Sequence, residues 1–383
     1  MTTDRKNPVP FTSVSLSEAE KIAVQEALES GHVHGDGPFA RRCERWLEEH
    51  HHTKRALLTH SCTGALEMAA LLADIGPGDE VILPSFTFVS TANAFVLRGA
   101  TPVFVDIRPD TLNLDENLVA GAIGPKTKAI VPVHYGGVGC AMDVLMELAA
   151  SREIAVIEDA AQGITATSDG RPLGSIGHLG CLSFHGTKNI VSGEGGALLV
   201  NDPAYMERAE IIREKGTNRA AFLSGQVDKY TWQDVGSSFL MSELAAALLY
   251  SQLTRSQEIQ ARRIKAWQRY QDAFEALEVA GLVRRPRTPL AMGHNAHVYY
   301  LLFDGLEARE RVRIGLREAG FAASFHYVPL HSSPAGRRYG RVGTSMSVTD
   351  SVADGLLRLP LYADLSQEEQ VAIIAQVKSL VDA

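Results

Sequence analysis

Two residues that could perform chemistry together, Asp159 and Lys188, each follow an apolar run. Asp159 closes the run of residues 155–158, and Lys188 comes soon after the run of residues 182–184. Ligands of open α/β sheets bind beyond the carboxyl ends of the strands, where both side chains are expected. A lysine amine there can bind a pyridoxal aldehyde covalently, and a carboxylate can keep the ring nitrogen protonated. For either residue taken alone, a helix-capping Asp or a surface Lys is the more common explanation.

Two further segments follow apolar runs in the same way. Thr63 and Gly64 open an apolar helix after the run of residues 55–59. Backbone N–H groups at a helix N-terminus suit a phosphate, although an ordinary N-cap explains the pattern equally well. Phe88 follows the run of residues 80–83 and could stack on a flat cofactor, although a Phe in this place more often belongs to the core. Either segment supports a cofactor site only in combination with Asp159 and Lys188.

Several familiar motifs are missing from the sequence. No GxxxxGK[ST] loop is present, and the glycines of residues 174–177 and 193–196 do not form a GxGxxG motif between a strand and a helix. Nucleotide hydrolysis and nicotinamide binding are therefore disfavoured. Residues 50–52 are three histidines without an HExxH motif or a second ligand cluster, so we expect no metal site.

The elements that must position these residues alternate along the chain. Short apolar runs alternate with helical patterns from about residue 56 to 202, which is typical of a mostly parallel, doubly wound α/β sheet. Residues 241–277 are predicted as one long helix or two consecutive helices, and a strand at 298–302 and helices at 308–318 and 368–381 follow. We expect a large α/β domain over residues 1–250, including an N-terminal arm, and a smaller α+β domain over residues 251–383.

Charge and cysteine content exclude several classes of protein. The 383 residues carry 37 Lys and Arg against 45 Asp and Glu, a net charge of −8, and no basic run, so nucleic acid is not an expected partner. The four cysteines lie far apart without a CxxC pair, which favours a reducing cytoplasm. The polar N-terminus and the absence of a long apolar segment predict no membrane association.

In order and approximate spacing, several of these residues resemble the fold-type I pyridoxal 5′-phosphate (PLP) enzymes, and among them the DegT/StrS-type sugar aminotransferases. The resemblance extends from residues 31–38 through 325–331 to 359–361, which is nearly the whole chain. It implies that Lys188 binds the cofactor, that Asp159 pairs with the pyridinium nitrogen, that Gln162 lies near the ring hydroxyl and that Phe88 stacks on the ring. The residues that it implies for the phosphate are Thr63, Gly64 and Ser183.

The resemblance also implies a homodimer with sites at the subunit interface. Related enzymes complete the phosphate site with an Asn of the second subunit, near the segment that here reads Gly236-Ser237-Ser238-Phe239. This chain has no Asn there, and Ser238 is the candidate that could donate a hydroxyl hydrogen bond instead.

Three segments, residues 84–95, 214–219 and 226–232, resemble those of the dTDP-4-amino-4,6-dideoxygalactose transaminases. This resemblance implies glutamate as amino donor and dTDP-4-dehydro-6-deoxyglucose as acceptor, for a surface polysaccharide such as O-antigen or enterobacterial common antigen. Candidate substrate contacts are His185, His326, Tyr327 and His331, each of which a structural role explains about equally well.

Other reactions stay open at this point. The acceptor could be a nucleotide-linked 3-keto sugar or another 4-keto sugar. A PLP dehydratase is a weaker alternative, because the related dehydratases carry His where this chain has Lys188. A catalytically silent regulator with a bound cofactor is a further alternative, although the sequence shows no helix-turn-helix or sensor segment beside the fold.

Overall fold

The computed structural model describes residues 8–381, and its centre is a mixed sheet in the order β1-β9-β8-β5-β4-β2-β3-β12. The strands from β8 to β12 run parallel to their neighbours, whereas β9 is antiparallel to both β8 and β1. The strands of this sheet are β1 (Arg55–Thr59), β2 (Glu80–Pro84), β3 (Thr101–Val105), β4 (Thr127–Ile130), β5 (Ala155–Asp159), β8 (Leu179–Ser183), β9 (Gly196–Val200) and β12 (Arg341–Val342).

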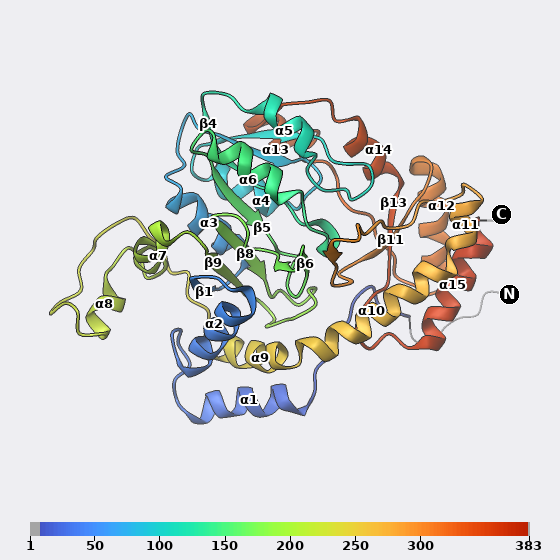
Figure 1. Ribbon diagram of the computed structural model, residues 1–383. Helices are drawn as coiled ribbons and strands as arrows, with labels where there is room; N and C mark the ends of the chain where they lie inside the picture. Colours follow the sequence, from blue (N-terminus) through green and yellow to red (C-terminus); the bar gives the residue numbers. More distant parts are fainter. Residues whose placement is uncertain (1–7, 382–383) are drawn as a thin grey trace.

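Helices cover both faces of this sheet (Figure 1). Side chains of a strand alternate between faces, so Val81 and Leu83 pack with α3, whereas Ile82 between them packs with α5 and α6. Helices α2 and α9 cover the part of the second face that β1, β8 and β9 form. The helices of this region are α1 (Glu18–Glu29), α2 (Pro38–His51), α3 (Cys62–Leu72), α4 (Val89–Val96), α5 (Glu116–Ala122), α6 (Met142–Ala150), α7 (Met206–Arg213), α8 (Arg219–Leu223) and α9 (Glu243–Thr254).

A second core lies in the C-terminal part, where α10 runs from α9 to the small sheet of β11 and β13 (Figure 1). Its apolar side chains include Trp267 and Tyr270 of α10, Val312 of α12 and Ile373 of α15. The elements are α10 (Ser256–Ala273), α11 (Glu275–Val279), β11 (Tyr299–Leu302), α12 (Gly305–Glu318), α13 (Pro334–Tyr339), α14 (Ser347–Gly355), β13 (Leu356–Leu359) and α15 (Gln367–Val381).

A third, small sheet joins the two parts of the chain. Its order is β10-β6-β7, from β6 (Thr167–Ser168), β7 (Arg171–Pro172) and β10 (Met292–Gly293). Strand β12 also returns from the C-terminal part to the edge of the large sheet, where it pairs with β3. The expected boundary at residue 250 lies inside α9, and the division into two domains at this point stays a prediction.

The α/β fold with a parallel-rich sheet is confirmed. Five of the seven expected strands agree with the observed ones to within one residue at each end. Strand β4 was expected over residues 129–133 and begins and ends earlier, and β8 begins three residues earlier than expected. The expected long helical region consists of α9, α10 and α11. The sequence analysis did not predict α1, α2 or β13.

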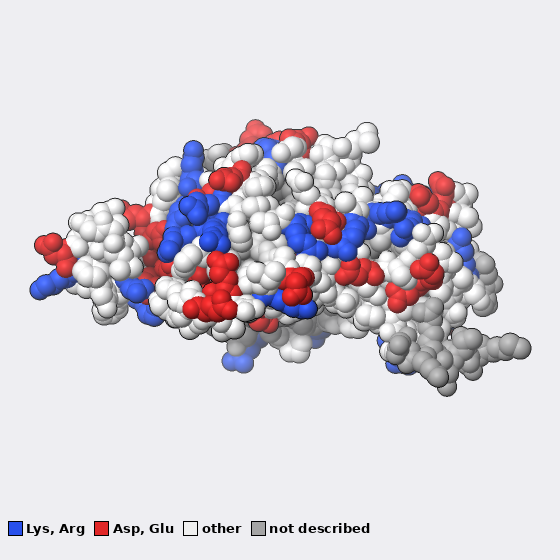
Figure 2. All heavy atoms as spheres, turned by 90° about the horizontal axis from the view of Figure 1, so that it is seen from below, with Lys and Arg blue, Asp and Glu red and all other residues white. Residues whose placement is uncertain are grey.

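The mixed charges of the surface and the buried cysteines are typical of a globular protein. Figure 2 shows basic and acidic side chains close together on one face, and the ion pairs of α10, such as Arg262 with Glu258, follow the same pattern. All four cysteines are buried and unpaired. None of the helices in residues 8–381 is long and apolar enough to cross a membrane.

Candidate active site

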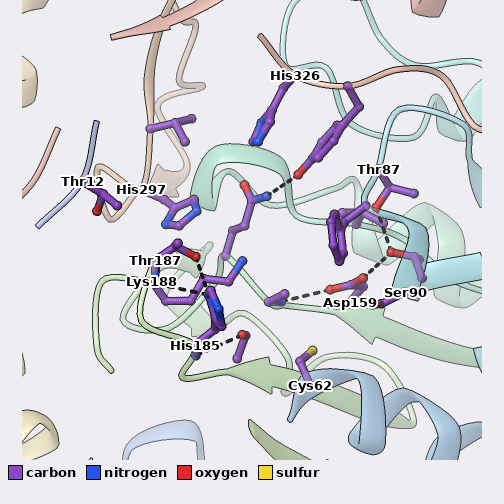
Figure 3. Close-up of a pocket in the computed structure, with 18 of the residues that line it drawn as sticks. Thr12, Cys62, Thr87, Ser90, Asp159, His185, Thr187, Lys188, His297 and His326 are labelled. Carbon is purple, nitrogen blue, oxygen red and sulfur yellow. Dashed lines mark hydrogen bonds between the residues drawn. The ribbon is translucent and has the colours of Figure 1, made fainter. Parts of the chain in front are cut away.

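A cavity of about 530 Å³ lies beyond the carboxyl ends of β5 and β8, beside the N-termini of α3 and α4. The large sheet and its helices form one wall, and residues of β13 and of the segments next to β11 and β13 form the other. Residues Phe11 and Thr12 of the N-terminal segment also line it. Asp159 and Lys188, far apart in the sequence, both point into this cavity (Figure 3). Within residues 8–381, no group of three or more His, Cys, Asp or Glu side chains could hold a metal ion.

Asp159 is the last residue of β5 and is held by two donors. Its Oδ2 accepts a hydrogen bond of 2.7 Å from Thr91 Oγ1, and its Oδ1 accepts one of 3.1 Å from the backbone N–H of Ala161. Thr91 Oγ1 lies in turn 2.8 Å from Thr87 Oγ1. Both threonines belong to the segment that enters α4, so this helix fixes the carboxylate at the floor of the cavity.

Lys188 lies in the loop that follows β8, with its amine in the cavity (Figure 3). Burial lowers the pKa of Lys188 below its ordinary value, and the charge of Arg358 acts in the same direction, whereas Cys62 and Asp159 act against this. A larger fraction of the amine is therefore neutral near pH 7 than for a solvent-exposed lysine. A neutral amine can act as nucleophile and as base.

Hydroxyl groups gather at the start of α3. Ser61 is the N-cap, and its Oγ accepts a hydrogen bond of 3.0 Å from the N–H of Gly64. Thr63 Oγ1 donates to Ser90 Oγ over 2.9 Å, and both residues line the cavity with Ser61 and Ser183. These hydroxyls and the N-terminus of α3 form a place for an anionic group such as a phosphate.

Two other expected cofactor residues line the same cavity. Phe88 is the N-cap residue of α4, and 61% of it is exposed in a single chain. Gln162 is held at both ends of its amide, because Oε1 accepts a hydrogen bond of 2.7 Å from the N–H of Gly136 and Nε2 donates one of 3.0 Å to the hydroxyl of Tyr327. The two sides of the cavity are thus joined through Gln162.

The sequence profile of the DegT/DnrJ/EryC1/StrS aminotransferase family matches residues 14–378. The chain belongs to this family. One relative is the spore coat polysaccharide biosynthesis protein SpsC of Bacillus subtilis, 34% identical over all of this chain and 99% of SpsC. Among solved structures, the aminotransferase TlmJ of Streptoalloteichus hindustanus is 32% identical with a TM-score of 0.90, over 98% of this chain and 99% of TlmJ. The PLP form of the putative sugar aminotransferase Spr1654 of Streptococcus pneumoniae is 28% identical with a TM-score of 0.89, over 98% and 99% of the two chains.

PLP is the cofactor of this aminotransferase, and the residues of the cavity fit it. The amine of Lys188 and the carboxylate of Asp159 face the same space, and the hydroxyl-rich N-terminus of α3 borders that space. These groups supply a covalent anchor, a partner for a protonated ring nitrogen and donors for a phosphate. The assignment of each cofactor residue stays a prediction from the family resemblance.

Gly64, in the first turn of α3, lies against the ring of His60. It is not among the residues that line the cavity, and a Cβ atom at this position would lie 2.6 Å from Cε1 of the His60 ring. The close approach of His60 is one reason for a glycine at this position, and the expected contact of Gly64 with the phosphate stays a prediction.

Three of the four expected substrate contacts line the cavity. His326 and Tyr327 lie on its C-terminal wall, with Nδ1 of His326 at 3.1 Å from the hydroxyl of Tyr135. Burial, together with the charges of Arg358 and Lys188, lowers the pKa of His326 well below its ordinary value, and burial raises the pKa of Tyr327 to about 12. His185 is exposed at the opening, where its Nδ1 lies 2.8 Å from Thr187 Oγ1.

Two of the predicted residues, His331 and Ser238, do not line the cavity of a single chain. The ring of His331 is 2.8 Å from Ser85 Oγ and 3.4 Å from Asp350, outside the cavity. This is the position of a structural contact between β2 and the C-terminal part, because both ring nitrogens face protein groups. Ser238 is exposed and pairs through its backbone with Glu214. Its expected contact with the cofactor of a second subunit stays a prediction.

The sequence analysis missed a cationic residue of the cavity. Arg358 of β13 donates to the carbonyl of Phe325 over 3.2 Å and lies over the ring of Phe11 at 4.5 Å. No acidic side chain among the described residues pairs with it, and burial lowers its pKa. A desolvated cation without a counter-charge suits an anionic group of a substrate. The only signal in the sequence was its place in an apolar run, Leu356-Leu357-Arg358-Leu359.

Proposed function

We propose that this sugar aminotransferase transfers an amino group from glutamate to C4 of a nucleotide-linked 4-keto-6-deoxyhexose. In the most specific form of the proposal, it converts dTDP-4-dehydro-6-deoxyglucose to dTDP-4-amino-4,6-dideoxygalactose for a surface polysaccharide. Support for the sugar comes from the three sequence segments described above, and support for a polysaccharide comes from the similarity to SpsC, a spore coat polysaccharide biosynthesis protein. The observation that carries the reaction type is the shared cavity of Lys188 and Asp159.

The residues of the cavity have separate roles in the two half-reactions. Bound PLP supplies an electron sink that stabilises negative charge on the neighbouring carbon. The amine of Lys188 takes the proton from the α-carbon of glutamate and later delivers a proton to C4 of the sugar. Asp159, fixed by Thr91, favours the protonated ring nitrogen. The face of the sugar carbon that meets Lys188 decides whether the new nitrogen is axial or equatorial.

The proposed active form is a homodimer. Phe88 and Val89, at the rim of the cavity and beside it, are exposed by 61% and 48% in one chain. The segment around α8 extends away from the body of the molecule (Figure 1), and near it Trp232 and Leu223 are exposed by 80% and 65%. Apolar side chains of this size are typical of a surface that a second subunit covers.

The alternatives predict different chemistry at residue 188. A dehydratase of this fold is disfavoured because Lys188, and not His, faces the cavity, and His185 lies at its exposed opening. A silent regulator would bind PLP without reacting with glutamate. The absorbance of the bound cofactor separates these cases, because an active aminotransferase shifts it when glutamate is added.

Lys188→Ala tests the central assignment. We expect loss of turnover and of the glutamate-dependent absorbance shift, because no other lysine lines the cavity within the described residues. Borohydride reduction followed by peptide mapping should find the cofactor on Lys188 of the native enzyme. Lys128→Ala, at an exposed position of β4, is the matched control. Substantial activity of Lys188→Ala, or a native residue 188 left unmodified, would exclude this role.

The substrate itself is tested with a panel of acceptors. The native enzyme is incubated with glutamate and with dTDP- and UDP-linked 4-keto and 3-keto sugars, and NMR identifies the aminated carbon of each product. The proposal expects amination at C4 of dTDP-4-dehydro-6-deoxyglucose with axial nitrogen. Amination at C3 only, or of a different sugar only, would contradict it.

A further inference from the structure

His297 lies on the C-terminal wall of the cavity, and α10 holds its backbone in place. Arg263 donates to the carbonyl of Ala296 over 3.2 Å and to that of His297 over 2.8 Å, and Trp267 donates to that of Val298 over 3.1 Å. Ala296 has a φ of 51°, a left-handed conformation that a non-glycine residue adopts at a cost. These three donors thus stabilise a strained backbone directly before a cavity-lining histidine.

The hydrogen bonds of Asn189 determine the tautomer of the His297 ring. Asn189 Nδ2 donates to the carbonyl of Asn295 over 2.8 Å, which orients the amide so that Oδ1 faces His297. Nδ1 of His297 lies 2.9 Å from this oxygen. Because a carbonyl oxygen can only accept, Nδ1 must carry the proton. In the neutral ring Nε2 then holds a lone pair.

Nε2 of His297 has no hydrogen-bond partner among the described residues, and it is not fully buried. It therefore faces the open space of the cavity. Burial lowers the pKa of His297 well below its ordinary value, and the charges of Lys188, Arg263, His326 and Arg358 act in the same direction. The ring is therefore neutral at pH 7. The cavity wall presents a hydrogen-bond acceptor at this point.

We propose that Nε2 of His297 accepts a hydrogen bond from a hydroxyl group of the keto sugar and thereby helps to select this substrate. The acceptor needs an O–H or N–H donor. The guanidinium groups of Arg263 and Arg358 near this position disfavour the ammonium group of an amino donor, whereas a neutral hydroxyl meets no such penalty. A keto sugar carries several hydroxyl groups, so it fits this position. The inference rests on the proposed sugar aminotransferase activity.

The tautomer is tested on the native holoenzyme without any substrate. With ¹⁵N-labelled histidine, and with His297→Gln to assign the signal, NMR should find Nδ1 protonated and Nε2 unprotonated from pH 6 to 8. A protonated Nε2 in this range would overturn the proposal, because that atom could no longer accept.

The role in selection is tested by measuring the two half-reactions separately. His297→Leu should lower kcat/KM of the sugar half-reaction about tenfold, the size of one net hydrogen bond in a desolvated site, and leave the glutamate half-reaction nearly unchanged. His297→Gln, which keeps an oxygen acceptor of similar reach, should recover most of the loss. Equal losses in both half-reactions would show a merely structural role, and no loss in either would also overturn the proposal.

Deoxygenated substrates identify the hydroxyl. With the native enzyme, one nucleotide keto sugar that lacks a single hydroxyl should react more slowly than the parent sugar. With His297→Leu, this analogue and the parent sugar should react at the same rate, because both changes remove the same hydrogen bond. Additive losses for every such analogue would overturn the proposal. If the native enzyme aminates no keto sugar, the proposed function fails, while the NMR measurement still decides whether His297 is an acceptor.

Discussion

Glu158, the residue before Asp159, is fully buried, and its carboxylate has four donors. Oε1 accepts from the N–H groups of Ile176 and Gly177 over 2.7 and 2.6 Å, and Oε2 accepts from the N–H of Gly174 over 2.9 Å. His134, also fully buried, places Nε2 at 2.7 Å from Oε2, and its Nδ1 accepts from a backbone N–H, so Nε2 is the donor. The carboxylate thereby holds the loop before β8 against β5.

Replacing this carboxylate by an amide should destabilise the protein strongly. In Glu158→Gln, the new NH₂ group must face one of the two pairs of donors, whichever way the amide turns. Two hydrogen bonds to a charged group are then lost, each of which contributes about 1.5–3 kcal/mol. We therefore expect the free energy of unfolding to fall by about 4 kcal/mol.

Thermal unfolding followed by circular dichroism measures this change. For a protein of this size, about 4 kcal/mol corresponds to a decrease in Tm of about 5–8 °C. Glu147→Gln is the matched control, because Glu147 is exposed on α6 and the same replacement there should leave the free energy within about 0.5 kcal/mol. A decrease in Tm of Glu158→Gln no larger than that of the control would refute the reasoning.

The difference between native protein and Glu158→Gln should also depend on pH in one direction. Burial alone would raise the pKa of Glu158, but the hydrogen bonds from His134 and the backbone N–H groups outweigh this, so the pKa lies below its ordinary value of 4.5. A carboxylate with a lowered pKa stabilises the folded state above the unfolded-state pKa and loses this contribution as the pH falls through the folded-state pKa. A difference in Tm that grows on acidification below pH 4.5 would contradict the assignment.

Two further predictions concern the cavity and its border. Arg358→Gln should raise KM about tenfold or more for an anionic substrate, because the half-buried guanidinium has no acidic partner among the described residues, and an unchanged KM for both glutamate and nucleotide sugar would refute this. Gly64→Ala should lower Tm, because the added Cβ would lie 2.6 Å from the His60 ring, and the decrease should be smaller in a His60→Ala background, where only the Phe239 ring, at 3.3 Å, stays close. An equal decrease in both backgrounds would show that His60 is not the obstacle.

The sequence was sufficient for the elements that periodicity and strand-end residues define. Asp159 and Lys188 were expected beyond the ends of two strands, and the structure places them in one cavity. Buried strands are apolar over their whole length, so β1, β2, β5 and β9 were easy to recognise. Strand β13 was missed because Arg358 interrupts a short apolar run and its partner β11 lies more than 50 residues away.

Other parts of the site depended on contacts between distant segments. His297 is an acceptor at Nε2 only because Asn189, 108 positions away, accepts a hydrogen bond from its Nδ1–H. His331 lies outside the cavity because Ser85, 246 positions away, holds its ring. Residue types and local spacing therefore determined the fold class and the cofactor chemistry, because strand ends and helix starts are local features. The tertiary structure alone decided which polar side chains are free to meet a substrate, because a hydrogen-bond partner can come from anywhere in the chain.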